Sequence, residues 1–222
     1  MKTYIKDILW NMWFSLPSCR KRQKEYENSA RSRFDKQKNG DFTIVSTNCI
    51  AGEIYHILGM PFTSPFINVS LDRNDFVTLA LNFKDYMQNP LEIVAKNDNG
   101  EWIGKLSCEN QKDIKMCFPH ETDKDVIIDN FERRKKRINY DNIYFITDDD
   151  GLTKESFEQF AKVECTNKII FTSKEYKEYP YTHYLSKYSG MPHVGKYQSK
   201  TKSGLYEFQT IWDFVEWFNS SK

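Results

Sequence analysis

A short β-branched segment, followed at once by polar residues and then by an amphipathic segment, constrains the fold of this chain most. Residues 42–46 read Phe-Thr-Ile-Val-Ser, and the polar residues Thr47 and Asn48 precede an apolar-periodic segment that ends at Gly59 and Pro61. This order is typical of a buried strand, a tight turn and the first turn of a helix. In α/β proteins, ligands bind at strand ends of this kind.

Strand and helix patterns alternate along the rest of the chain. The sequence Asn97-Asp-Asn-Gly100 is a strong hairpin signal, whereas residues 174–204 show no clear periodicity and are expected to form a loop. Further strands are expected at 66–71, 91–95, 101–107, 113–118, 142–147 and 168–172, and helices at 73–89, 122–137, 154–161 and near the C-terminus.

This alternation predicts an α/β fold class, with a layered sheet of mostly parallel strands flanked by helices. The hairpin would be an antiparallel addition to that sheet, and helices would precede it at the N-terminus. We expect residues 1–40 to form an N-terminal helical segment and residues 41–222 to form a single α/β domain.

Charge and cysteine content narrow the class of protein. The formal net charge is only +1, whereas nucleic-acid-binding domains are usually strongly basic, so no nucleic-acid partner is expected. The five cysteines have neither CxxC nor Cys/His ligand spacing, which is typical of reduced thiols. No segment approaches the roughly 20 apolar residues that a membrane span requires. We therefore expect a cytoplasmic protein.

The N-terminal segment concentrates positive charge behind an apolar stripe. Residues 1–40 hold ten Lys or Arg against four acidic residues, a net charge of +6. Residues 1–38 could therefore contact the inner face of an anionic membrane peripherally. The alternative is a first helix that packs on its own domain. The apolar stripe consists of Ile5, Ile8, Leu9, Met12, Trp13 and Leu16.

Three residues around the first turn are candidates for thiol catalysis. Cys49 is expected near a helix N-terminus, where the helix dipole lowers the pKa of a thiol. Glu53 and His56 follow at about one and two helical turns, so an acid, a thiol and an imidazole could share a face. The alternative is a small buried cysteine, since free cysteines are among the most buried residue types.

Acidic residues follow the strand pattern at 142–147. Asp148 and Asp150 could hold Mg²⁺ or Mn²⁺ against a diphosphate, because hard cations prefer oxygen ligands. The alternative is an ordinary turn through Gly151 that leads to a helix cap at Thr153.

A basic run, residues 133–137, ends the helix expected at 122–137. Arg134 and Arg137 lie close on one helical face, where they could bind a diphosphate bidentately. The alternative is a solvated helix end whose positive charge complements the helix dipole.

Several of these motifs, in this order, resemble one bacterial family, the domain of unknown function nineteen-nineteen, often labelled exopolysaccharide biosynthesis protein. Family members often have two glycines where this chain has Ala51-Gly52. The resemblance implies a glycan-related role in the cytoplasm or at the inner membrane face, and it implies no particular reaction. The matching segments are Ser46–Cys49 with Gly52 and Tyr55, Leu58-Gly59, Ser64-Pro65, Arg133–Asn139 with Asn142-Ile143, and Asp148–Gly151. The recurrent residues that it implies are Asn48, Cys49, Gly52, Tyr55, Ser64, Pro65, Arg134, Arg137, Asn139, Asp148 and Asp150.

Besides thiol chemistry at Cys49, two functional hypotheses follow. The first is a metal-dependent glycosyltransferase or related transferase that takes a sugar nucleotide or another phosphate-bearing donor and acts on a glycan precursor. In it, Asn48 and Gly52 flank a turn whose backbone N–H groups face an anion, and Tyr55 and Asn139 join the ligand-binding residues. The second is a non-catalytic module that binds a glycan or a partner in a polysaccharide assembly system.

Overall fold

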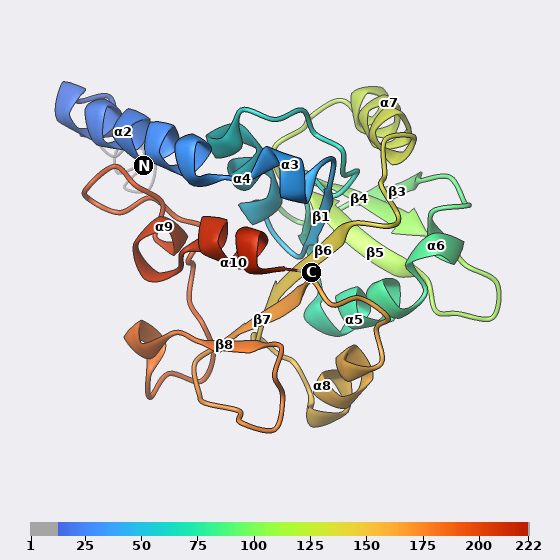
Figure 1. The fold of residues 1–222 in the computed structure, drawn as a ribbon. Coiled ribbons are helices and arrows are strands. Elements are labelled where there is room, and N and C mark those ends of the chain that lie inside the picture. The colour runs from blue at the N-terminus through green and yellow to red at the C-terminus, as the bar shows by residue number, and fades with distance from the viewer. Residues whose placement is uncertain (1–12, 222) are drawn as a thin grey trace.

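The computed structural model describes residues 13–221, which form two sheets and the helices around them (Figure 1). One is a parallel sheet of four strands in the order β1-β6-β7-β8. The other is an antiparallel sheet of four strands in the order β2-β5-β4-β3. The predicted α/β fold class is confirmed, although the antiparallel part is a full sheet. The strands are β1 Thr43–Ser46, β2 Ser70–Leu71, β3 Glu92–Lys96, β4 Trp102–Leu106, β5 Ile114–Phe118, β6 Ile143–Asp148, β7 Lys168–Thr172 and β8 Thr182–Tyr184.

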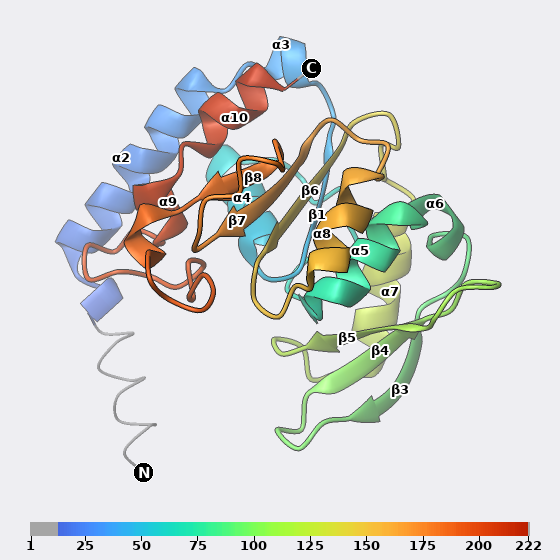
Figure 2. The ribbon, with the colours of Figure 1, turned by 90° about the horizontal axis from the view of Figure 1, so that it is seen from below.

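Helices cover both faces of the parallel sheet. Figure 2 shows α2, α4 and α10 on one face and α5 and α8 on the other, with the antiparallel sheet beyond α5. The helices are α2 Pro17–Arg33, α3 Lys36–Asn39, α4 Ile50–Leu58, α5 Arg73–Leu81, α6 Phe83–Tyr86, α7 Lys124–Lys135, α8 Lys154–Ala161, α9 Phe208–Ile211 and α10 Phe214–Ser220, with a 3₁₀ turn at Ser186–Tyr188.

The strands β1, β6 and most of β7 are buried on both faces, as expected for a sheet between helical layers, whereas the edge strand β8 is partly exposed. Ile44 and Tyr144 belong to the core that includes side chains of α4 and α10. Their neighbours Val45 and Phe145 belong to the core that includes side chains of α5, α8 and the antiparallel sheet. The alternation along each strand therefore fixes the register, because a shift of one residue would exchange the two cores.

The N-terminal helix α2 packs against the C-terminal helix α10. Phe34, just after α2, contacts Phe42 and Phe218 edge to face. Arg33 pairs with Asp213, their nearest side-chain atoms lying 2.5 Å apart. Within residues 13–221, no helix is both long and apolar enough to cross a membrane.

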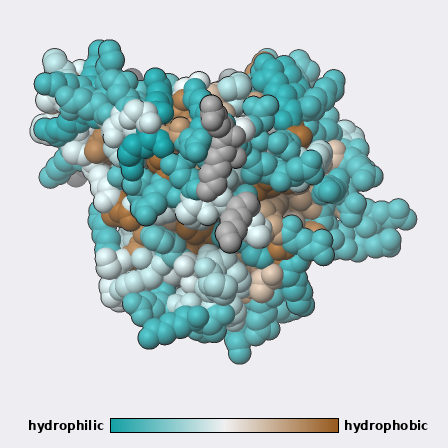
Figure 3. Space-filling view, viewed as in Figure 1, coloured by the Kyte–Doolittle hydropathy of each residue, from teal (hydrophilic) through white to brown (hydrophobic). Residues whose placement is uncertain are grey.

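The expected apolar stripe lies mostly outside the described residues. Of its members, Trp13 and Leu16 are described, and both are exposed, by 46% and 41% respectively. Figure 3 shows mainly hydrophilic side chains over α2 and α7 on this face of the molecule. Peripheral membrane contact through residues 1–38 stays a prediction. The remaining members of the stripe, Ile5, Ile8, Leu9 and Met12, are not among the described residues.

Two segments differ from the sequence-based expectation. The strand expected at 66–71 is only Ser70–Leu71, because Phe66 donates its backbone N–H to Ser64 Oγ and Asn68 has a left-handed φ of 59°. Conversely, the expected loop at 174–204 contains β8, which pairs with β7. Both differences depend on contacts with distant parts of the chain, which local periodicity does not record.

A buried tyrosine connects α4 to β1. Tyr55 is 0% exposed, and its hydroxyl accepts the backbone N–H of Ile44 at 2.9 Å. The same hydroxyl lies 3.2 Å from the carbonyl oxygen of Phe42 and 2.7 Å from the hydroxyl of Thr63. Burial raises the pKa of Tyr55 to about 12, so the phenol keeps its proton. Tyr55, expected to bind a ligand, is placed to fix α4 on the sheet.

We predict that Tyr55→Phe lowers the free energy of unfolding by about 1–3 kcal/mol, because the Ile44 N–H loses its buried acceptor. Urea denaturation followed by circular dichroism measures this change. Tyr140→Phe is the matched control, because the Tyr140 side chain is exposed. An equal loss in both variants would contradict the role given to the Tyr55 hydroxyl.

Candidate functional site

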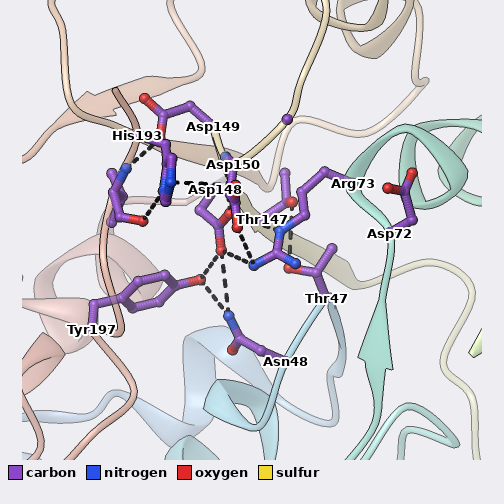
Figure 4. Close-up of polar contacts among 12 residues, drawn as sticks. Thr47, Asn48, Asp72, Arg73, Thr147, Asp148, Asp149, Asp150, His193 and Tyr197 are labelled. Atoms are coloured by element: carbon purple, nitrogen blue, oxygen red, sulfur yellow. Dashed lines mark hydrogen bonds and ion pairs between the residues drawn. The ribbon is translucent and has the colours of Figure 1, made fainter. Parts of the chain in front are cut away.

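Polar residues meet at the carboxyl ends of β1 and β6. These two strands are parallel neighbours, so Ser46 and Asp148 end at the same edge of the sheet. Figure 4 shows Asn48, Asp148 and two residues from elsewhere in the chain, Arg73 and Tyr197, pointing toward one another. Such an edge is where open α/β sheets bind ligands.

The centre of this cluster is an ion pair between Arg73 and Asp148. Arg73 Nε lies 2.8 Å from Asp148 Oδ1, and a terminal guanidinium nitrogen lies 3.0 Å from Oδ2, so the pair is bidentate. The Asp148 side chain is only 2% exposed and that of Arg73 21%. Burial acts to lower the pKa of Arg73, but the hydrogen bond and charge of Asp148 outweigh it and raise that pKa. Arg73 therefore keeps its positive charge beside the Asp148 side chain.

Asn48 and Tyr197 complete the network around Asp148. The Tyr197 hydroxyl lies 3.2 Å from Asp148 Oδ2, and the Asn48 amide nitrogen lies 2.8 Å from the Tyr197 oxygen and 3.5 Å from Oδ2. Burial, followed by the charge of Asp148, raises the pKa of Tyr197 well above its ordinary value. Tyr197 is therefore a neutral phenol that donates to Asp148 and accepts from Asn48.

The predicted metal ligands, Asp148 and Asp150, do not fit a Mg²⁺ or Mn²⁺ site as arranged. Both oxygens of Asp148 already accept hydrogen bonds, including one from the Asp150 backbone N–H at 3.2 Å. Asp150 itself lies 3.6 Å from His193 Nε2 and 4.0 Å from Arg73. Within residues 13–221, no three His, Cys, Asp or Glu side chains are placed to hold a metal ion. The positive charge beside Asp148 is the guanidinium of Arg73. Metal binding by Asp148 and Asp150 stays a prediction.

Asp149, the middle residue of the acidic run, connects the site to two further segments by hydrogen bonds. Asp149 Oδ2 accepts the backbone N–H and the hydroxyl of Ser173 at 2.7 and 2.9 Å, and Oδ1 accepts the backbone N–H of Val194 at 2.6 Å. Asp149 thus has partners other than those of Asp148 and Asp150, which both lie near Arg73. These contacts offset part of the repulsion between three neighbouring negative charges.

Cys49 meets an imidazole that spacing alone did not point to. Its sulfur lies 3.4 Å from Nε2 of His120, which follows β5. Burial, followed by the charge of Glu53, raises the pKa of Cys49, opposite to the lowering that the helix dipole alone would give. His56 is exposed on the far part of α4, and its charge interacts with Glu53. The structure therefore brings Cys49 and Glu53 together with His120, and His56 lies at their margin.

Glu53 is a largely buried carboxylate on the first turns of α4. Burial raises its pKa above the ordinary value of 4.5, although a hydrogen bond from Tyr206 and the charges of Lys200, His56 and His120 act in the opposite direction. Burial and this same contact also raise the pKa of Tyr206. Tyr206 therefore stays protonated, and its hydroxyl donates a hydrogen bond to Glu53.

A small cavity lies between α7 and the segment that follows α4, and His120 lines it together with Arg134 and Asn68. The Arg134 guanidinium stacks over the Phe62 ring, 5.2 Å from its centroid. Burial, followed by the charges of Arg133 and Arg137, lowers the pKa of Arg134. Among residues 13–221, no carboxylate pairs with it.

The first turn of α4 forms part of the same region. A Cβ atom on Gly52 would lie 3.2 Å from Asn68 Oδ1 and 3.3 Å from a methyl group of Ile67, and both residues line the cavity. Gly52 therefore allows a close approach of α4 to this wall. Of the predicted ligand-binding residues, Arg134 thus lines the cavity, and Gly52 packs behind its wall.

The other predicted ligand-binding residues lie elsewhere. Arg137 is exposed and donates to the Phe62 carbonyl oxygen at 3.4 Å. Asn139 donates through its side chain to the Asp41 carbonyl oxygen at 2.7 Å, near the start of β1. Asn139 thus lies at the end of the sheet opposite to the Asp148 network, whereas Arg137 contacts the segment that follows α4. Sequence reasoning also missed Arg73 and Tyr197 as site residues, since neither belongs to a recognisable motif.

We predict that Arg73→Met lowers the free energy of unfolding by about 3–5 kcal/mol, because it leaves the Asp148 carboxylate buried without its partner. Arg73→Lys should lie between Arg73→Met and the parent protein, since a single amine cannot replace two parallel hydrogen bonds. Urea denaturation measures both changes. Arg133→Met, on the surface of α7, is the control, and a similar loss there would refute the special role of Arg73.

A second prediction concerns the charge of Glu53. Burial raises the pKa of Glu53 in the folded state. Ionising Glu53 therefore destabilises the fold, and this loss of stability sets in as the pH rises above the ordinary pKa that Glu53 has in the unfolded chain. Glu53→Gln should therefore raise the melting temperature at pH 7 and have a smaller effect at pH 4. Thermal denaturation at both pH values measures this difference. A stabilisation that is the same at pH 4 and pH 7 would exclude this explanation.

Comparisons with known proteins agree with the resemblance noted from the motifs. The family described as "Domain of unknown function (DUF1919)" matches residues 20–219 of this chain. A protein of Haemophilus influenzae described as "Uncharacterized protein" is 30% identical over 200 residues, which cover 90% of this chain and 93% of that relative. The chain therefore belongs to the DUF1919 family.

Proposed function

We propose that this protein is a glycan-related transferase whose phosphate-bearing, nucleotide-sugar-like donor binds at the cavity that Arg134 and His120 line. One observation carries the proposal: Arg134 is a half-buried guanidinium that no carboxylate neutralises within the described residues. A buried charge is costly unless it is paired. An anionic ligand would supply the missing partner.

Phosphate is the anion that best matches this guanidinium. Arginine presents a planar fork of donors that binds phosphate oxygens bidentately. Burial and the neighbouring charges of Arg133 and Arg137 lower the pKa of Arg134, and a phosphate dianion would reverse both effects. The first turn of α4 lies against the cavity wall at Gly52, and a helix N-terminus attracts negative charge.

The hydrogen bonds around Asp148 fix the position of the first turn of α4. Asn48 accepts the backbone N–H of Ile50 through its side-chain oxygen at 3.0 Å, and its amide nitrogen contacts Asp148 and Tyr197. The start of α4 is therefore held to β6 by buried hydrogen bonds. A preorganised first turn loses little entropy when an anion binds, which favours recognition.

The glycan part of the proposal rests on the motif resemblance, and the phosphate part on the cavity. The acceptor would be a hydroxyl group of a glycan precursor. No step of this proposal passes through a metal ion, because both oxygens of Asp148 accept hydrogen bonds. The second hypothesis, a non-catalytic glycan- or partner-binding module, remains the alternative outcome of the test.

Thermal denaturation with nucleotide sugars tests the donor site. We predict that a uridine or guanosine diphosphate sugar raises the melting temperature, with a stabilisation of about 2.7 kcal/mol at a concentration of 100 Kd. Arg134→Met should weaken binding roughly 10- to 150-fold, since a hydrogen bond to a charged group contributes about 1.5–3 kcal/mol. The shift should occur both with and without Mg²⁺.

Arg133→Met is the matched control, because Arg133 lies next to Arg134 on α7 and is exposed. It should bind the same donor with little change in affinity. If no nucleotide sugar or inorganic diphosphate produces a shift at millimolar concentration, the donor proposal is wrong and the binding-module hypothesis is favoured. Equal weakening in both variants would show a diffuse charge effect in place of a specific site.

A further inference from the structure

Cys49 and His120 form a contact that the proposed function does not use. The sulfur and Nε2 lie 3.4 Å apart, although the residues are 71 positions apart in the sequence. Cys49 is partly exposed at the start of α4, and His120 is exposed in the segment between β5 and α7. A nucleophile and a base in hydrogen-bonding distance, both within reach of solvent, are the two parts that covalent catalysis requires.

Glu53 provides a third charged group near the pair. Its carboxylate interacts electrostatically with both Cys49 and His120. When the imidazole takes the thiol proton it becomes an imidazolium, and a nearby carboxylate stabilises that cation. Tyr206 donates a hydrogen bond to Glu53, which helps to fix its position.

The other cysteines have different surroundings. Cys165 lies 3.0 Å from the Ile143 carbonyl oxygen, and Cys117 lies 3.1 Å from a carboxylate oxygen of Glu101. All five cysteines are free thiols. Among the described residues, only Cys49 has an imidazole as its hydrogen-bonding partner. Because no second cysteine contacts it, attack on an external electrophile fits this site better than disulfide exchange.

We infer that Cys49 and His120 are a nucleophile–base pair that accepts an acyl group from an activated ester or thioester. This inference goes beyond the proposed function. It shares His120 with the proposed donor cavity, but the Cys49–His120 contact does not include Arg134. The carbonyl carbon is the electrophile because a sulfur nucleophile forms a thioester with it directly, and the reaction needs no oxidant or reductant.

The two half-reactions balance as follows. The sulfur of Cys49 forms a bond to the carbonyl carbon while its proton passes to Nε2 of His120. The bond between that carbon and the leaving group breaks, and the leaving group takes the proton from His120. An acceptor hydroxyl or water then attacks the thioester carbon and gives its proton to His120. The bond between that carbon and the sulfur breaks, and the proton from His120 restores the thiol of Cys49.

The electrostatics of Cys49 predict that the reaction depends on the base. Burial and Glu53 raise the pKa of the thiol, so little thiolate is present at neutral pH without proton transfer. Removing the imidazole should therefore slow acylation strongly. A cysteine that was already a thiolate would react at a similar rate without it.

Acylation by p-nitrophenyl acetate tests this inference on the full chain. We expect a burst of p-nitrophenol equal to the protein concentration, with a single acetyl group located on Cys49 by peptide mass spectrometry. Cys49→Ala should remove the burst. His120→Ala should slow acylation roughly 10²- to 10⁴-fold, the usual contribution of a general base, and free imidazole should restore part of the rate.

Cys108→Ala is the matched control, since Cys108 is also partly exposed and burial also raises its pKa. It should keep the full burst. Acetylation of another cysteine, or a His120→Ala variant that keeps its fold by circular dichroism and reacts as fast as the parent, would overturn the inference. Because the probe contains no phosphate, the donor proposal can fail while this result stands, and the reverse also holds.

Discussion

The buried ion pair between Arg73 and Asp148 is the interaction on which the rest of the site depends. Asp148 ends β6 of the parallel sheet, and Arg73 is the first residue of α5, which packs between that sheet and the antiparallel one. The side chain of Asp148 is 2% exposed, so its charge is tolerated only with a partner of excellent geometry. Asn48 and Tyr197 both lie beside Oδ2, the same Asp148 oxygen that a terminal guanidinium nitrogen of Arg73 contacts.

Local patterns predicted much of the fold because most elements carry their own signals. The strand expected at 168–172 is β7 with the same bounds, and the helix expected to end at Gly59 does so with a left-handed φ of 66°. The strand β8 escaped prediction because only pairing with β7 defines it. The segment 66–71 was misread for a related reason: its apolar residues pack into the core without joining a ladder.

The sequence predicted one member of each contact in the candidate site and missed its partner. Asp148 and Cys49 lie at strand ends, a position that indicates function from sequence alone. Their partners, Arg73 and His120, lie 75 and 71 positions away and belong to no motif. One sequence contains no record of such pairings, because they arise when the two sheets are placed side by side. Spacing alone named His56 as the imidazole near Cys49, whereas the structure places His120 against the Cys49 sulfur.

Two adjacent residues at the start of α4 have different surroundings. Asn48 is buried and bonded to Tyr197, whereas Cys49 is partly exposed and contacts His120. Nearby, Glu53 and Arg134 carry charges that burial opposes. Charged groups whose burial costs free energy are expected where a ligand or a reaction makes use of them. Glu53 and Arg134 both lie near the first turns of α4, and the hydrogen bonds around Asp148 fix that part of the helix. This arrangement is the strongest physical reason to place the function of this protein near the start of α4.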